Sequence, residues 1–269
     1  MTNTIHAAEN PAMVNDMLSK LDKEAEKEVE VSIQPPSDTT VNLPGGYVLP
    51  TGEVIRTAEV RELTGRDEEA IARASNPGRV VLTVLQRGLV KVGNLNADEA
   101  LLDKLLSGDR DMILLGIFKA TFGKTADINT WCGGCSEIKI VQVDIDKDIP
   151  VKVLVDPVAD RIFTVKGKRS EFTVQLPTGV VQRELLTATD KNAAELATIL
   201  LENTLLQIDG QPVLSKLQVQ NLNMVDRRTI LDAVNARVVG PQFDDLTVAC
   251  PDCEGEVVVP VNLGTLFRL

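Results

Sequence analysis

The chain has 269 residues, with 39 acidic against 28 basic side chains, so its formal net charge is −11. This balance excludes a typical nucleic-acid-binding protein, because phosphate groups are neutralised by lysine and arginine in excess. Aromatic residues make up 3% of the chain, so we expect a core of aliphatic side chains. No apolar stretch approaches the roughly 20 residues of a membrane-spanning helix, and the first residues lack the features of a signal peptide. We therefore expect synthesis in a cytosol, where thiols stay reduced.

The sequence offers few of the side chains on which enzymes depend. His6 is the only histidine, which excludes Ser-His-Asp triads, Cys-His pairs and histidine-rich metal sites. Neither of the common glycine-rich phosphate-binding loops is present. We therefore expect a protein that is not an enzyme.

Residues 1–38 have a composition of their own. From Glu9 to Asp38 there are eight acidic residues against three lysines, and Pro35-Pro36 would end any helix there. We expect an acidic, flexible N-terminal arm, which either stays disordered or folds on a partner.

Residues 39–125 are predicted to form a hairpin region followed by helices. PGG (44–46) and PTG (50–52) have the composition of turns, so hairpins are expected at both. A strand is expected from about residue 54 to residue 63, although its apolar and polar residues do not alternate cleanly.

Helix signals follow in the same region. Thr64 and Asp67 are spaced as a capping box, in which each side chain satisfies a backbone amide of the other residue. Three further helices are expected from apolar residues at spacings of three and four. The first of these helices is expected after Pro77. The second is expected to be capped by Asn96 and Glu99, and the third to begin near Asp109.

Strand-like segments dominate after the first cysteine pair. SEIKI (136–140) and VQVDI (141–145) each alternate, but Ile140 and Val141 are adjacent, so we expect a bulge or break between them. Residues 151–239 are expected to form a mixed strand and helix insertion. The predicted fold class is α+β, with a helical N-terminal half and a strand-rich C-terminal half.

All four cysteines lie in two C-x-x-C pairs, Cys132/Cys135 and Cys250/Cys253. Four thiolates are the donor set of a tetrahedral structural zinc site. Gly133-Gly134 and Pro251-Asp252 have turn composition, and strand-like sequence follows each pair. The pattern predicts a zinc-ribbon-like module from residues 126–150 and 240–269, which joins the segments near 130 and 250. Four cysteine ligands leave no open coordination position, so the expected Zn²⁺ is structural.

Two other interpretations of the cysteines stay open, a dithiol oxidoreductase and structural disulfides. WCGGC resembles a thioredoxin active site, with Cys132 as nucleophile and Cys135 as resolving thiol. In that fold the pair opens a helix, whereas the residues after Cys135 alternate like a strand, and the second pair would have no role. We favour zinc, and we interpret Trp131, the sole tryptophan, as a packing residue over the zinc module.

Three segments carry a resemblance to a known family, namely PGGYVLPTGEVIRTAEVRELTGRDEEAIA, WCGGCSEIKI and the C-terminal CPDCEGEVVVPVNLGTLFRL. They resemble tailed-bacteriophage baseplate hub and tail assembly proteins similar to those of T-even phages, with relatives in contractile injection systems. The resemblance spans roughly residues 42–269 and is most specific at Leu63–Glu69 and at the terminal CPDC…LFRL.

The resemblance implies a structural component of a phage baseplate or tail hub, which would reach the virion tail after assembly in the host cytoplasm. The alternative within the family is an assembly chaperone that is absent from the mature virion. No catalytic residues carry over, and the four cysteines carry over as a metal site. The implied partners are other tail proteins, contacted through residues 1–38, helix faces and Leu266–Leu269, with no nucleic acid and no membrane.

Overall fold

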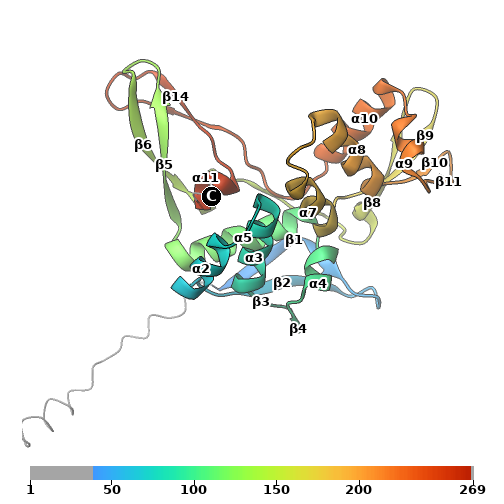
Figure 1. Ribbon diagram of the computed structural model, residues 1–269, viewed down its shortest axis with the longest axis horizontal. Coiled ribbons are helices and arrows are strands. Elements are labelled where there is room, and N and C mark those ends of the chain that lie inside the picture. Colours follow the sequence, from blue (N-terminus) through green and yellow to red (C-terminus); the bar gives the residue numbers. More distant parts are fainter. Residues whose placement is uncertain (1–38, 268–269) are drawn as a thin grey trace, which may run out of the picture. The chain divides into compact units, whose positions relative to one another are not determined.

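The computed structural model describes residues 39–267, which lie within one compact unit (Figure 1). Helices and strands both occur throughout this range, which confirms the predicted α+β class. The expected contrast between a helical N-terminal half and a strand-rich C-terminal half is not clear. A four-stranded sheet lies in the first half of the described residues, and several helices lie in the second. The predicted acidic arm, residues 1–38, lies outside the described residues.

The first core packs helices on an antiparallel sheet. The sheet has the strand order β1 (Thr40–Val48), β2 (Val54–Val60), β3 (Leu89–Val92) and β4 (Leu95–Asn96). The helices are α2 (Gly65–Ala72), α3 (Pro77–Gly88), α4 (Glu99–Lys104) and α5 (Ser107–Phe122). The core is aliphatic, as the composition predicted, and Leu85, Leu102 and Ile117 are fully buried in it. Helix α5 approaches β1 so closely that a Cβ on Gly116 would lie 2.2 Å from Val41 Cγ2, so this contact requires glycine.

The two glycine-containing segments of the first hairpin have different roles. Gly52, with a φ of 88°, lies in the expected turn between β1 and β2. The PGG segment instead lies inside β1, where the register with β2 shifts between Asn42 and Tyr47, so the turn predicted there was wrong. The N–H of Gly45 donates to Asp109 Oδ1 at 2.7 Å, and this contact with a buried carboxylate anchors the irregular part of the strand.

Side-chain caps define where the helices begin. At the start of α2, the N–H of Thr64 donates to Asp67 Oδ2 at 2.9 Å, which confirms the predicted capping box. Helix α4 begins after Asp98, whose Oδ1 accepts from the N–H of Leu101 at 2.7 Å. The prediction that Asn96 caps this helix was therefore wrong, since Asn96 belongs to β4. Two cap-forming residues in close succession satisfy the same sequence pattern, and the strand pairing decides between them.

A second sheet and its helices form a separate core within residues 151–239, the region predicted to be a mixed insertion. The sheet has the antiparallel order β11 (Gln211–Pro212), β10 (Leu205–Ile208), β9 (Glu171–Gln175) and β8 (Ile162–Lys166). Its helices are α8 (Ala193–Thr204), α9 (Lys216–Gln220) and α10 (Met224–Asn235). Phe172, Leu201, Ile230 and Val234 are fully buried at its centre.

Short elements connect these parts of the chain. They are α6 (Ile145–Asp148), β7 (Val151–Lys152), the 3-10 helix η2 (Ala159–Arg161), α7 (Gly179–Thr187) and β12 (Gly240–Pro241). Helix α7 packs on α3 and α8, and β7 pairs with β12. Within residues 39–267, no helix combines the length and the apolar composition that crossing a membrane requires.

A third core lies where α5 meets the C-terminal helix α11 (Leu263–Phe267). Leu266 is buried in it, and the ring of Phe267 packs edge-on against Phe118, with ring centroids 5.4 Å apart. Leu266 and Phe267 belong to the segment Leu266–Leu269 that was predicted to contact partners, and both contact the chain's own core. Arg268 and Leu269 lie outside the described residues.

Candidate metal centre

Two hairpins that are far apart in the sequence lie side by side (Figure 1). They are built from β5 (Thr125–Cys132) with β6 (Glu137–Asp144), and from β13 (Leu246–Ala249) with β14 (Glu256–Val259). Thr130 Oγ1 donates to the carbonyl oxygen of Val258 at 2.7 Å, across 128 positions of sequence. Each C-x-x-C pair lies at the turn end of its hairpin, with Cys132 as the last residue of β5, so the pairing of the hairpins sets one cysteine pair opposite the other.

The two cysteine turns are built in the same way. In each turn the residue after the second cysteine, Ser136 or Glu254, donates its N–H to the carbonyl oxygen of the first cysteine at 2.9 Å. Both residues are left-handed, with φ of 56° and 57°, a conformation that costs a non-glycine residue about 1–2 kcal/mol. Among residues 39–267, Asp209 is the one other non-glycine residue with a positive φ. The same unfavourable backbone at both turns indicates that the sulfur positions matter to the fold.

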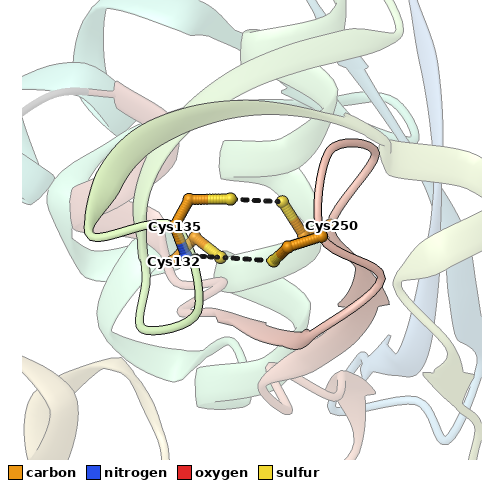
Figure 2. Close-up of side chains that lie close together, drawn as sticks. Cys132, Cys135 and Cys250 are labelled. Carbon is orange, nitrogen blue, oxygen red and sulfur yellow. Dashed lines mark hydrogen bonds between the residues drawn. The ribbon is translucent and has the colours of Figure 1, made fainter.

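The sulfur atoms of the four cysteines converge between these turns. The Sγ atoms of Cys132 and Cys253 are 3.6 Å apart, those of Cys135 and Cys250 are 3.7 Å apart, and all four lie within 4.8 Å of one another. Figure 2 shows the sulfurs of Cys135 and Cys250 facing each other from opposite turns. A tetrahedron of sulfurs about 2.3 Å from a central ion has edges of about 3.8 Å, whereas a disulfide joins sulfurs at about 2.05 Å. The cluster therefore has the spacing of a metal site, and all four cysteines are free of disulfides.

The thiols of the cluster differ in proton affinity. A hydrogen bond from the backbone N–H of Asp252, helped by that of Cys253, lowers the pKa of the Cys250 thiol to about 7. The pKa of the Cys135 thiol is raised, chiefly by its hydrogen bond with the Cys253 sulfur. Thiolates at this spacing repel one another, so the four groups can all lose their protons only when a cation lies between them. The cluster is suited to bind a metal ion and to release protons as it does so.

Packing on one side and a close contact on the other hold the cysteines in place. Cys132 and Cys250 are 0% and 2% exposed and form a small apolar cluster with Val257. On the other side Gly134 comes so close that a Cβ there would lie 2.8 Å from Cys253 Sγ. The apolar environment makes an ion-free cluster of charged thiolates unfavourable, and Gly134 leaves room for the sulfur.

Two contacts that the sequence analysis missed join the hairpins. Lys139 of β6 donates to Glu137 Oε2 and to Asp252 Oδ2, both at 2.6 Å, and so connects the first hairpin to the second cysteine turn. Thr130 makes the second contact, to the backbone of β14. The sequence contains one sign of the first contact, because Lys139 is the one basic residue of these hairpin segments. It does not show with which acidic residue Lys139 forms an ion pair.

The structure brings all four predicted metal ligands together, but it corrects two expectations about β6 and Trp131. The bulge predicted between Ile140 and Val141 was wrong, because β5 and β6 pair without a register shift along their whole length. The alternation of apolar and polar residues shifts by one position along β6 because its apolar residues lie on opposite faces of the strand. Ile138 and Ile140 are exposed, whereas Val141 packs against the core. Trp131 is 60% exposed, so its predicted packing over the metal module was also wrong.

No family model, curated protein or solved structure matches the chain. The resemblance to phage baseplate proteins therefore stays a prediction from the sequence, whereas the clustering of the four cysteines is observed in the structure.

Proposed function

We propose that this chain is a non-enzymatic, structural protein of a bacteriophage tail, a part of the baseplate or tail hub, stabilised by one structural Zn²⁺. The tail role is supported by the resemblance of roughly residues 42–269 to baseplate hub and assembly proteins. The zinc site is supported by one geometric observation above all, the convergence of four sulfur atoms from two distant hairpins to within 4.8 Å of one another.

Zn²⁺ suits this donor set because it favours tetrahedral coordination by thiolates. With Cys132, Cys135, Cys250 and Cys253 all bound, no coordination position is left for water or substrate, so the ion would act as a cross-link between the hairpins. Iron also accepts four thiolates, but it colours the protein, whereas Zn²⁺ does not.

Metal analysis of the purified full-length chain tests the zinc site. We expect one zinc per chain, and loss of that zinc in Cys250→Ser. One iron per chain in a coloured protein would overturn the choice of zinc. A folded wild-type chain that contains no metal and binds none would overturn the metal centre itself.

The dithiol oxidoreductase is the competing function, and the WCGGC segment is what favours it. Two features of the cluster argue against it. A turn and then strand β6 follow Cys135, so the helix N-terminus on which a thioredoxin-type active site depends is not formed there, and Cys132, the expected nucleophile, is fully buried. The competing function predicts that the metal-free protein reduces insulin disulfides, and that Cys132→Ser abolishes this reaction.

Mass spectrometry of purified virions tests the tail role. A structural part is expected in the particles at a constant ratio to other tail proteins. Absence from particles, together with defective tails when the gene is deleted, would favour an assembly chaperone instead. Absence from particles together with normal tails would overturn the tail role in both forms.

A further inference from the structure

The outer face of the β5–β6 hairpin carries apolar side chains that the core does not use. Trp131 lies directly opposite Ile138 in the strand register, and Ile140 lies one outward-facing pair further along, opposite Asn129. The exposed fractions of Trp131, Ile138 and Ile140 are 60%, 67% and 70%. Directly opposed side chains are about 5 Å apart and diagonal ones about 7–8 Å, so the three form one continuous surface. We call these three residues the hairpin patch.

The core of the protein does not explain the hairpin patch. Along β5 the alternate residues Ala126, Ile128 and Cys132 are buried, so the inner face of the hairpin already supplies the packing. A solvated strand face ordinarily carries polar residues. This chain has one tryptophan in 269 residues and places it on the solvent side of a strand. Tryptophan in an apolar surface cluster is typical of the centre of a protein interface.

The hairpin patch lies in an acidic part of the molecule. Residues 125–144 and 246–259 contain six acidic residues against one lysine. That lysine, Lys139, has a side chain that is 13% exposed and is held between Glu137 and Asp252. A metal ion bound by four thiolates would leave the site with a further negative charge. A complementary surface would therefore be apolar at its centre and basic around it.

We infer that the hairpin patch is the docking site for a different protein, which presents an apolar pocket bordered by lysine and arginine. A second copy of the chain would set one acidic hairpin pair against another, and each whole chain has a net charge of −11. The segment 1–38 of the same chain is an unfavourable occupant for the same reason, because its net negative charge would be repelled by the acidic hairpins. A metal ion bound by the four cysteines would hold the hairpin in its binding conformation in advance, which would reduce the entropy lost on association. This inference deepens the proposed tail role, because it names the surface that would join the chain to a neighbour, and it rests on that role for the choice of candidate partners.

The first test uses Trp131 as its probe, in the isolated full-length chain. Because the chain has no other tryptophan, its indole fluorescence reports on the hairpin patch alone. We expect a water-exposed indole that acrylamide quenches freely, in a chain that sediments as a monomer. An indole protected from acrylamide in the monomer would show that the chain itself covers the patch. A dimer that Ile138→Thr/Ile140→Thr dissociates would show that a second copy covers it, and either result would overturn the inference.

The second test measures binding to a partner. Each tail protein encoded in the same genome is purified and titrated against the full-length chain, with Trp131 emission and calorimetry as readouts. We expect one of them to bind with a blue shift of Trp131, and to bind less tightly as the salt concentration rises. Ile138→Thr/Ile140→Thr should weaken this binding at least about tenfold. The matched control is Val155→Thr, at a position that is 92% exposed and lies outside both hairpins, and it should bind as the wild type does.

The outcomes separate this inference from the tail role. Binding that Ile138→Thr/Ile140→Thr leaves unchanged overturns the docking site and leaves the tail role standing. Binding to no tail protein also overturns the docking site, and the presence of the chain in purified particles then decides the tail role separately. A partner whose binding surface is acidic or uncharged around its apolar centre would overturn the inferred border of lysine and arginine.

Discussion

Cys250→Ser removes one sulfur from the cluster and is expected to release the metal ion. Without the ion, no cross-link joins Cys135 to Cys250, which are 115 positions apart. In the chain-entropy description, a cross-link that closes a loop of this length contributes about 5 kcal/mol to the free energy of unfolding, because it restricts the unfolded chain. Binding of the metal to unfolded cysteines would reduce this figure, so we expect a loss of about 3–5 kcal/mol.

Urea unfolding of the wild type, of Cys250→Ser and of Cys132→Ser/Cys250→Ser measures this loss, with and without a chelator. The chelator should lower the stability of the wild type to that of the variants and should leave the variants unchanged. The double variant should lose little more than the single variant, because one ion is lost in both cases. Fully additive losses, or a wild type that the chelator does not affect, would show that the cysteines act as separate packing residues and would refute the metal centre.

Three further predictions concern buried carboxylates and one close backbone contact. Hydrogen bonds from Arg61 hold the pKa of the buried Asp67 carboxyl well below its usual range, so Asp67→Asn should cost about 1–3 kcal/mol near pH 7, and less as the pH falls below about 4. Burial raises the pKa of Asp109 to about 6, so the stability of the wild type relative to Asp109→Asn should fall by up to about 3 kcal/mol as the pH rises from about 4 to about 7. Urea unfolding from about pH 2 to about pH 7 checks both. A Cβ on Gly108 would lie 1.7 Å from a backbone carbonyl oxygen, so Gly108→Ala should cost about 3 kcal/mol or more in thermal unfolding, whereas Gly65→Ala, with open space around it, should cost under about 1 kcal/mol.

The parts of the site that could be predicted are those that depend on residues close together in the sequence. Two C-x-x-C pairs with turn residues inside them identify the candidate metal ligands, because thiolate donors and tight turns are requirements that act within a few residues. The capping box of Thr64 and Asp67 was predictable for the same reason, since its partners are three positions apart. The sequence did not show that Lys139 meets Asp252, because that contact spans 113 positions.

The errors share a physical cause. The bulge predicted between Ile140 and Val141 followed from the assumption that apolar residues of one strand face one core. The strand is regular, and its apolar residues change face because Ile138 and Ile140 point to solvent. The same assumption assigned Trp131 to packing. An exposed apolar side chain and a buried one look alike in sequence, so burial has to be observed.

The order of amino acids was sufficient for the α+β content, the aliphatic core, the first helix cap and the choice of the four cysteines as candidate metal ligands. The folded chain confirmed the predicted meeting of the two cysteine turns, and it was needed to learn which contacts join their hairpins, that PGG lies within β1, and that the outer face of the β5–β6 hairpin is apolar. The reason is one of distance along the chain. Turns, caps and alternation act over a few neighbouring residues, whereas the sulfur cluster depends on contacts between segments 115 to 128 positions apart.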